Sequence, residues 1–198
     1  MSTNDNGGPV LNGRLVSLRP FVPEDAPAAH RIVGDSRVTN SLSFDEKSEE
    51  ETQGMISGII SRATEENRTE YYLAVDRTGD LIGFCRLGRE GVRAGQIGYA
   101  IRADEWGKGY ATDAVETIVR FSIETLGLHR VTAAIGPENI ASITIVRKLG
   151  FQYEGTLRDH VFTNGAWRNS LLYSIIDHEW QAREGAQAGA AGVSKHRA

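Results

Sequence analysis

The most informative stretch of the chain is Trp106-Gly107-Lys108-Gly109-Tyr110-Ala111-Thr112. It stands between a strand-like segment, residues 96–102, and an amphipathic segment, residues 111–126, whose apolar side chains recur at helical spacing. A glycine-rich turn that opens a helix leaves backbone N–H groups unpaired at the positive end of the helix dipole. Glycine also lets an anion approach the backbone closely, because no Cβ stands in the way. The stretch therefore predicts a phosphate-binding turn, with Lys108 adding charge at its rim.

Two common glycine-rich phosphate motifs do not match this turn. A P-loop requires Gly, four residues and then Gly-Lys-Ser/Thr, whereas Gly107-Lys108 is followed by Gly109 and no Gly stands five positions before Gly107. The dinucleotide fingerprint requires a further Gly or Ala where this chain has Thr112. Spacing alone leaves a plain strand-to-helix connection open.

Composition indicates one ordinary globular domain. A chain of 198 residues buries roughly 70% of the surface that its unfolded form exposes. The net charge of −4 argues against a nucleic-acid binder that works by bulk electrostatics. The single cysteine, Cys85, excludes an internal disulfide and a cysteine-based zinc set, and its place in a strand-like segment indicates a buried packing residue.

The ends of the chain are polar or rich in Ala and Gly. We expect residues 1–11 and 182–198 to be disordered, which leaves a single domain over residues 12–181. The N-terminus lacks the charged and apolar regions of a signal peptide, and no apolar run approaches the ~20 residues that span a bilayer. The sequence therefore predicts a cytoplasmic protein without membrane or nucleic-acid partners.

Hydrophobic periodicity predicts a mixture of strands and helices. Strands are expected at residues 14–20, 71–75, 81–87, 96–101, 130–135, 151–157 and 171–176, and helices at 23–33, 46–62, 111–126 and 139–149. The order indicates an α/β (α+β) fold in which about four helices flank a mixed, mostly antiparallel central sheet of about six to seven strands.

Several motifs in this order resemble the GNAT N-acetyltransferases. They are Gly98-Tyr99, the stretch 106–112, Asn139-x-x-Ser142, and Lys148-Leu149-Gly150-Phe151 followed by Glu154-Gly155. Residues 14–20 and Glu179-Trp180 resemble the RimJ/RimL-like branch, whose members acetylate protein N-terminal amines. The resemblance covers about residues 12–181, nearly the whole chain.

The resemblance implies acetyl-CoA as the cosubstrate and no metal. The glycine turn is expected to bind the pyrophosphate, and the sheet to splay between the strand that ends near Ile101 and the strand that begins near residue 130. The pantetheine arm then lies in that slot against free strand edges, and a backbone N–H polarises the thioester carbonyl. The implied cofactor-binding residues are Ile101, Trp106, Gly107, Lys108, Gly109, Tyr110, Ala111, Thr112, Asn139 and Ser142.

Two polar residues at the start of the helix 139–149 are candidates for the chemistry. Asn139 suits the N-cap, and the resemblance adds a contact to the cofactor arm; both roles stay open. Many family members carry a tyrosine at the position of Val146, where it protonates the leaving thiolate, and valine cannot donate. The resemblance therefore makes Ser142 the candidate catalytic acid, with a simple packing role as the alternative.

The general base is not identified. Many family members have a glutamate where this chain has Gln96. The remaining candidates are Glu70, Glu90, Asp104, Glu105 and His160. An N-terminal α-amine has a reference pKa of about 7.7–8.0, so a strong base is not required for such an acceptor.

We expect an acetyl-CoA-dependent N-acetyltransferase, a monomer or homodimer, whose acceptor is the primary amine of a protein N-terminus or of a small molecule. The amine attacks the thioester directly, through a tetrahedral intermediate. Four aromatic residues either line the acceptor groove or belong to the core: Tyr71, Tyr72, Phe162 and Trp167. The alternatives are a CoA-binding regulatory module without catalysis, suggested by Gln96 and Val146, and the same fold with another acyl donor.

Overall fold

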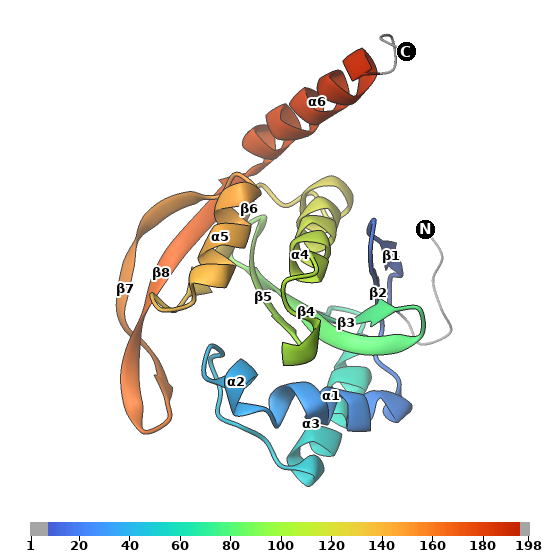
Figure 1. Ribbon diagram of the computed structural model, residues 1–198, viewed down its shortest axis with the longest axis vertical. Coiled ribbons are helices and arrows are strands. Elements are labelled where there is room, and N and C mark those ends of the chain that lie inside the picture. Colours follow the sequence, from blue (N-terminus) through green and yellow to red (C-terminus); the bar gives the residue numbers. More distant parts are fainter. Residues whose placement is uncertain (1–7, 195–198) are drawn as a thin grey trace.

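A computed structural model of the chain describes residues 8–194 (Figure 1). One eight-stranded sheet has the order β1-β2-β3-β4-β5-β6-β8-β7. The strands are β1 (Leu11–Asn12), β2 (Ser17–Arg19), β3 (Glu70–Arg77), β4 (Asp80–Glu90), β5 (Ala94–Ile101), β6 (Arg130–Ile135), β7 (Gln152–Thr163) and β8 (Ala166–Ile176). Only the pair β5 and β6 is parallel, so the predicted mixed, mostly antiparallel sheet is confirmed.

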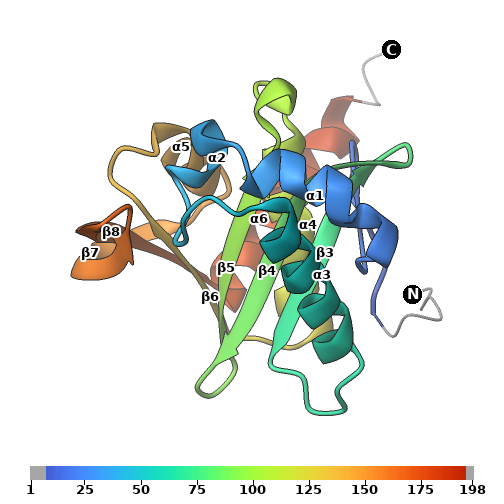
Figure 2. The same ribbon diagram turned by 90° about the horizontal axis from the view of Figure 1, so that it is seen from below.

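Helices cover both faces of this sheet. Within the described residues they are α1 (Ala26–Val33), α2 (Ser36–Thr39), α3 (Glu49–Ala63), α4 (Tyr110–Arg120), α5 (Ile140–Lys148) and α6 (Asp177–Ser194). Figure 1 shows α4 and α5 over β5 and β6, and Figure 2 shows α1 and α3 on the opposite side. None of the described helices combines the length and the apolar character needed to cross a membrane.

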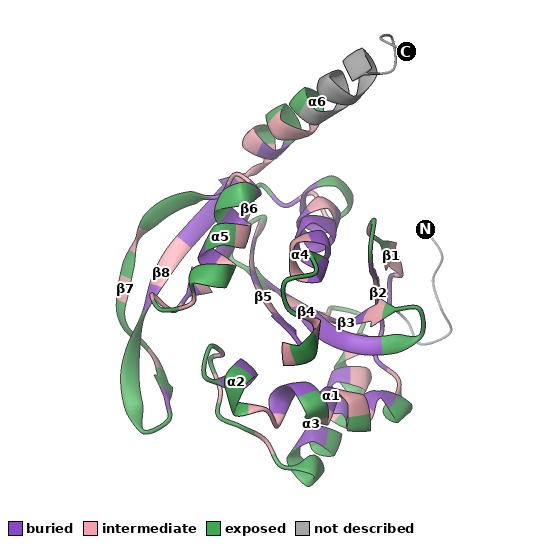
Figure 3. Cartoon of the chain, viewed as in Figure 1, coloured by how far each residue is buried: buried purple, intermediate pink, exposed green. Residues whose placement is uncertain are grey.

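Helix α4 begins where the sequence predicts it, because its apolar residues lie on one stripe; it ends at Arg120, and the rest of the predicted helix is a π-helical turn, Phe121–Thr125. Ala114, Val115 and Ile118 have no exposed surface and pack in the larger of two core clusters, with side chains from the sheet and from α5. Figure 3 shows the buried side of α4 in purple. The second cluster lies between the sheet and α1 and α3. Two cores, one on each face, hold the sheet rigidly between the helices.

The sheet splays at its only parallel pair. β5 and β6 pair at Ala94 with Arg130, Gly95 with Val131 and Gln96 with Thr132, and at no later position. Beyond Gln96, β5 continues to Ile101 and β6 continues to Ile135 without bridges between them. The expected slot between these two strands is therefore present.

The ends of the described chain differ from the expected disorder. Leu11 pairs with Leu18 in β1, and residues 182–194 continue α6; residues 1–7 and 195–198 lie outside the described part. The buried Glu116 carboxylate on α4 accepts hydrogen bonds from Arg14 (2.6 Å) and Arg183 (2.7 Å). Arg14 and Arg183 thus hold the chain against α4 near both ends of the described part, which composition does not show.

The number of elements also exceeds the expectation. The sheet has eight strands rather than six to seven, because β1 adds a short edge strand. Helices α2 and α6 bring the described helices above the expected four. The last two strands are longer than predicted and form a hairpin, whose turn residues Asn164 and Gly165 adopt φ of 51° and 72°.

Candidate active site

The glycine turn leads from the short 3-10 turn Ala103–Glu105 into α4. Gly107 and Gly109 have φ of 76° and 85°, the left-handed region that glycine adopts without strain. Gly109 is the N-cap of α4, and no side chain of the described residues caps the helix. The first backbone bond into the helix joins the Asp113 N–H to the Gly109 carbonyl at 3.1 Å. The N–H groups of the preceding helical residues are therefore left for a ligand.

The space over the turn is free for an anion. A Cβ added at Gly107 would meet no atom of the described chain within 4 Å. The three N–H groups at the start of α4 belong to Tyr110, Ala111 and Thr112, and the helix dipole adds to their attraction for negative charge. The turn thus offers backbone donors and open space to an anion.

Two side chains of the turn fold back onto the protein. The Trp106 indole donates a hydrogen bond to the Ile101 carbonyl at 2.7 Å and so ties the turn to the end of β5. The Lys108 ammonium contacts the Glu105 carboxylate at 2.9 Å and the Asp104 carbonyl at 3.1 Å. Lys108 is therefore neutralised by a neighbour in this structure rather than standing free at the rim.

Asp113 fixes the first turn of α4 from the inside, a role that the sequence analysis missed. Its buried carboxylate accepts hydrogen bonds from the N–H groups of Arg14 (2.9 Å), Leu15 (2.7 Å) and Val16 (3.0 Å). Acidic residues are favoured in the first turn of a helix, which was the available signal. This carboxylate holds the N-terminal segment against the helix that carries the turn.

The edge of β5 presents backbone donors to the slot. Arg102 donates its N–H to the Ile82 carbonyl on β4 at 2.8 Å. Because backbone groups alternate along a strand, the N–H groups of Tyr99 and Ile101 point to the opposite edge, toward β6. Both residues lie beyond the last bridge to β6, at Gln96. The slot therefore offers donors to amide groups or to a thioester oxygen.

The start of α5 borders the slot. The Asn139 side-chain oxygen accepts a hydrogen bond from the Ser142 N–H at 3.0 Å, which confirms the predicted N-cap. Ser142 is half-buried, and its carbonyl accepts a hydrogen bond from the Tyr99 hydroxyl at 3.4 Å. Its own hydroxyl makes no hydrogen bond with any residue between 8 and 194. Val146 is fully buried in the core.

Tyr99 is the second residue that the sequence analysis did not assign to the site. Its side chain packs with the cluster that includes α4 and α5, on the same side as Ile97 and Ile101. Burial raises the pKa of the Tyr99 hydroxyl to about 12. The sequence analysis included Tyr99 only in a motif. Its contact with α5 joins residues 43 positions apart, which a local pattern does not reveal.

A cavity of about 90 Å³ lies where β6 and the β7–β8 hairpin meet the segment after α2. The residues that matter for its chemistry are Asn40, Ala134, Glu138, Asn139, Arg168 and Ser170. The Arg168 guanidinium donates to the Asn40 carbonyl at 2.8 Å and so closes one side. Ala134 lies on the part of β6 that pairs with β8 but not with β5, so the cavity lies beside the slot.

The five candidate general bases differ in the residues that they contact. Glu70 is paired with Arg86 and Glu105 with Lys108. The Arg102 guanidinium contacts Asp104 at 2.7 Å and lowers the pKa of that carboxyl. Glu90 is exposed near the end of β4, where it pairs with Ala94. His160 alone of the five contacts a residue of the cavity, because its Nδ1 lies 3.0 Å from the Ser170 hydroxyl.

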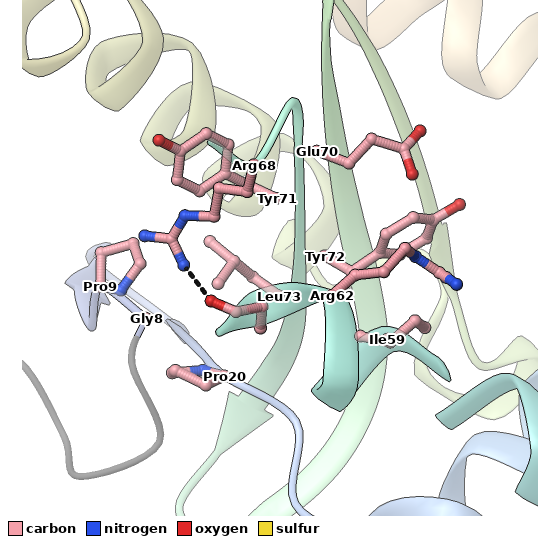
Figure 4. Close-up of a pocket in the computed structure, with 11 residues that line it drawn as sticks. Gly8, Pro9, Pro20, Ile59, Arg62, Arg68, Glu70, Tyr71, Tyr72 and Leu73 are labelled. Atoms are coloured by element: carbon pink, nitrogen blue, oxygen red, sulfur yellow. Dashed lines mark hydrogen bonds between the residues drawn. The ribbon is translucent and has the colours of Figure 1, made fainter. Parts of the chain in front are cut away.

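None of the four aromatic residues lines this cavity. Tyr71 and Tyr72 line a separate hollow beside β3, where Figure 4 shows them with Arg68. The Arg68 guanidinium lies 4.5 Å from the Tyr71 ring centre, and the hollow, about 20 Å³, has room for little more than one water molecule. Phe162 and Trp167 form an exposed edge-to-face pair on the β7–β8 hairpin.

Neither Cys85 nor the grouping of acidic and histidine side chains among the described residues indicates a metal site. Cys85 is fully buried, as expected of a packing residue, and burial raises the pKa of its thiol to about 12. Within the described part of the chain, no three His, Cys, Asp or Glu side chains are grouped to hold a metal ion.

Comparison with known proteins identifies the family to which this arrangement belongs. Residues 15–152 match the family model described as an acetyltransferase (GNAT) domain. The chain belongs to the GNAT family. Its members are acetyl-CoA-dependent acyltransferases, and the expected GNAT fold and cosubstrate are thereby confirmed.

Individual relatives agree with this assignment. The chain is 28% identical over 169 residues to the spermidine N(1)-acetyltransferase of Escherichia coli (strain K12), covering 84% of this chain and 89% of the relative. It is 30% identical over 97 residues to the [ribosomal protein uS5]-alanine N-acetyltransferase of the same organism, which covers 49% of this chain and 50% of that protein. The structure of Mycobacterium smegmatis RimJ in complex with CoA-disulfide superposes with a TM-score of 0.78 at 25% identity, covering 88% of this chain and 90% of that one.

Proposed function

We propose that this GNAT protein transfers the acetyl group of acetyl-CoA to a primary amine by direct attack on the thioester. The observation that supports this most is the uncapped start of α4, beside a slot in the sheet. An anion site and an open strand edge next to each other suit a ligand that carries a diphosphate on a flexible amide-containing arm.

Each predicted cofactor-binding residue has a place in this proposal. The turn residues Gly107, Gly109, Tyr110, Ala111 and Thr112 bind the pyrophosphate through backbone N–H groups. Trp106 and Lys108 hold the turn in shape, through their contacts with Ile101 and Glu105. The N–H of Ile101 faces the slot and is a donor for the arm or for the thioester oxygen.

At the other side of the slot, Asn139 and Ser142 begin α5. Asn139 uses its side-chain oxygen for the cap, so its amide nitrogen is the group that would contact the arm. Ser142 carries a free hydroxyl and is the acid that the family resemblance indicates for the leaving thiolate. Ser142→Ala tests this role: a lower turnover with an unchanged dissociation constant of acetyl-CoA would support it, and an unchanged rate would assign the proton to another donor.

The acceptor is proposed to enter through the 90 Å³ cavity beside β6. Glu138 is the carboxylate that lines it, Arg168 is the guanidinium, and most other lining groups are amides and hydroxyls. A polyamine carries several positive charges and would favour more carboxylates than this. The cavity therefore favours an acceptor with one ammonium group and neutral amides, such as a protein or peptide N-terminus.

A proton must leave the amine before it attacks. His160 contacts the cavity through Ser170 and is the proposed base, acting directly or through a water molecule.

The test is thiol release from acetyl-CoA with a panel of peptides that differ in their first residue, with spermidine and with small amines. We expect release with peptides that carry a free α-amine and none with their N-formylated forms. Binding of acetyl-CoA without release for any amine would instead support the regulatory module. Faster release from a longer acyl-CoA would support a different donor.

A further inference from the structure

The part of β5 that does not pair with β6 places one phenol beside the slot. Tyr99 lies three residues beyond Gln96, the last residue of β5 that pairs with β6. Its cross-strand partner on β4 is Cys85, which is fully buried on the side of α4 and α5. Tyr99 is therefore aimed at the face of the sheet that carries the phosphate-binding turn.

The hydroxyl of Tyr99 reaches the first turn of α5. It donates to the carbonyl of Ser142 at 3.4 Å, a distance at the outer limit of a hydrogen bond. A bond this long leaves the proton available to a better acceptor that comes within reach. The hydroxyl thus lies between the edge of β5 and the cap of α5, the two elements that border the slot.

The leaving group of the transfer is a thiolate, which needs a proton or a strong donor as the C–S bond breaks. Val146 is fully buried and has no donor. Even with its pKa raised to about 12 by burial, the Tyr99 phenol is closer in acidity to a thiol, near 8.5, than an aliphatic hydroxyl such as that of Ser142. Of the two hydroxyls at the start of α5, the phenol is the better matched acid.

We propose that Tyr99, in place of Ser142, is the catalytic residue whose hydroxyl protonates the leaving sulfur. This inference rests on the proposed acetyl transfer. The amine nitrogen forms a bond to the thioester carbon, and the tetrahedral intermediate then expels sulfur with the electron pair of the C–S bond. The Tyr99 proton passes to that sulfur and gives the free thiol. The proton that the amine has lost then reprotonates the phenolate.

Burial of the ring keeps the Tyr99 hydroxyl protonated before the reaction. Because burial raises the pKa of Tyr99 to about 12, the hydroxyl holds its proton at neutral pH until a thiolate forms beside it.

The first experiment compares Tyr99→Phe with Ser142→Ala and the control Tyr71→Phe. Tyr71 is a half-buried strand tyrosine on β3, outside the slot. We expect Tyr99→Phe to lower kcat about 100-fold with an unchanged KM for acetyl-CoA, and Tyr71→Phe to leave both unchanged. Thermal unfolding of the variants checks their folding, since Tyr99→Phe removes only one long hydrogen bond.

The leaving group identifies the step. A pantetheine analogue whose thiol has a lower pKa gives a thiolate that leaves more easily. Its acetyl thioesters therefore need less help from an acid. They should restore most of the rate of Tyr99→Phe and gain little with the wild type. If instead Ser142→Ala alone is rescued by such donors, or if Tyr99→Phe keeps the wild-type rate, the role of Tyr99 is wrong.

Binding gives a measurement that does not depend on turnover. Calorimetry with CoA and with desulfo-CoA, which lacks the sulfur, reports any bond from Tyr99 to that atom. We expect CoA to bind about five-fold more tightly than desulfo-CoA to the wild type and equally to Tyr99→Phe. An equal difference in both proteins would overturn the inference, whereas wild-type protein that binds CoA but acetylates no amine would refute the proposed function instead.

Discussion

Replacing Gly107 with alanine tests whether the glycine turn binds acetyl-CoA. Gly107 has φ of 76° and open space around a built Cβ, so the protein itself loses only the cost of a left-handed alanine, about 1–2 kcal/mol. A methyl group in that space keeps a phosphate away from the N–H groups of α4. Loss of one hydrogen bond to a charged group costs about 1.5–3 kcal/mol. We therefore expect the dissociation constant of acetyl-CoA to rise at least about ten-fold.

Gly79 provides the matched control. It has φ of 91° in the β3–β4 turn, and a Cβ there also meets nothing within 4 Å. Gly79→Ala and Gly107→Ala should lose similar stability, with melting temperatures lower by about 2–4 °C for each kcal/mol. Only Gly107→Ala should weaken acetyl-CoA binding, measured by calorimetry. Equal affinity in the two variants would show that the phosphate does not use this turn.

Three further variants test the supporting residues. Asp113→Ala removes the acceptor of three backbone N–H groups, one of them buried. It should lower the free energy of unfolding by about 2–4 kcal/mol in urea titrations, and Asp113→Asn should lower it less. Equal losses in the two variants would contradict the hydrogen-bond role. His160→Asn should lower kcat/KM for a peptide about ten-fold at pH 7, and the loss should shrink as the pH rises through the pKa of the acceptor amine; a pH-independent loss would exclude a base. Because burial raises the pKa of Cys85 to about 12, the native thiol stays protonated while the unfolded thiol ionises above about pH 8.5, so stability should fall with rising pH from there. Cys85→Ala should reduce that fall by the share of one thiol, and an identical pH dependence would refute this account.

The glycine turn and α4 could be predicted because their signals are local. The turn needs two glycines at fixed spacing, and the helix needs an apolar stripe within 16 positions, residues 111–126. The N-cap at Asn139 is likewise a contact over three positions. Such features depend on neighbours in the sequence, so a single sequence contains all the information required to find them.

The features that were missed depend on distant contacts. α6 is anchored where Arg183 meets Glu116, 67 positions away, and the N-terminal segment where Arg14 meets Glu116, 102 positions away. The cavity likewise joins Asn40 to Arg168 across 128 positions. Hydrophobic periodicity contains no information about polar contacts between residues so far apart in the sequence. The sequence therefore could not place the ends of the chain or choose among the candidate bases.

Helix α4 lies beside two kinds of negative charge: its own buried carboxylates and the proposed diphosphate ligand. Asp113 and Glu116 are buried carboxylates in the first two turns of α4, close to the end that is proposed to bind a diphosphate. Left uncompensated, they would repel that ligand across a medium of low dielectric constant. The N–H groups of three N-terminal residues compensate Asp113, and Arg14 and Arg183 compensate Glu116. Both ends of the chain thus neutralise the inner side of α4, which leaves the positive end of the helix dipole available to the cosubstrate outside.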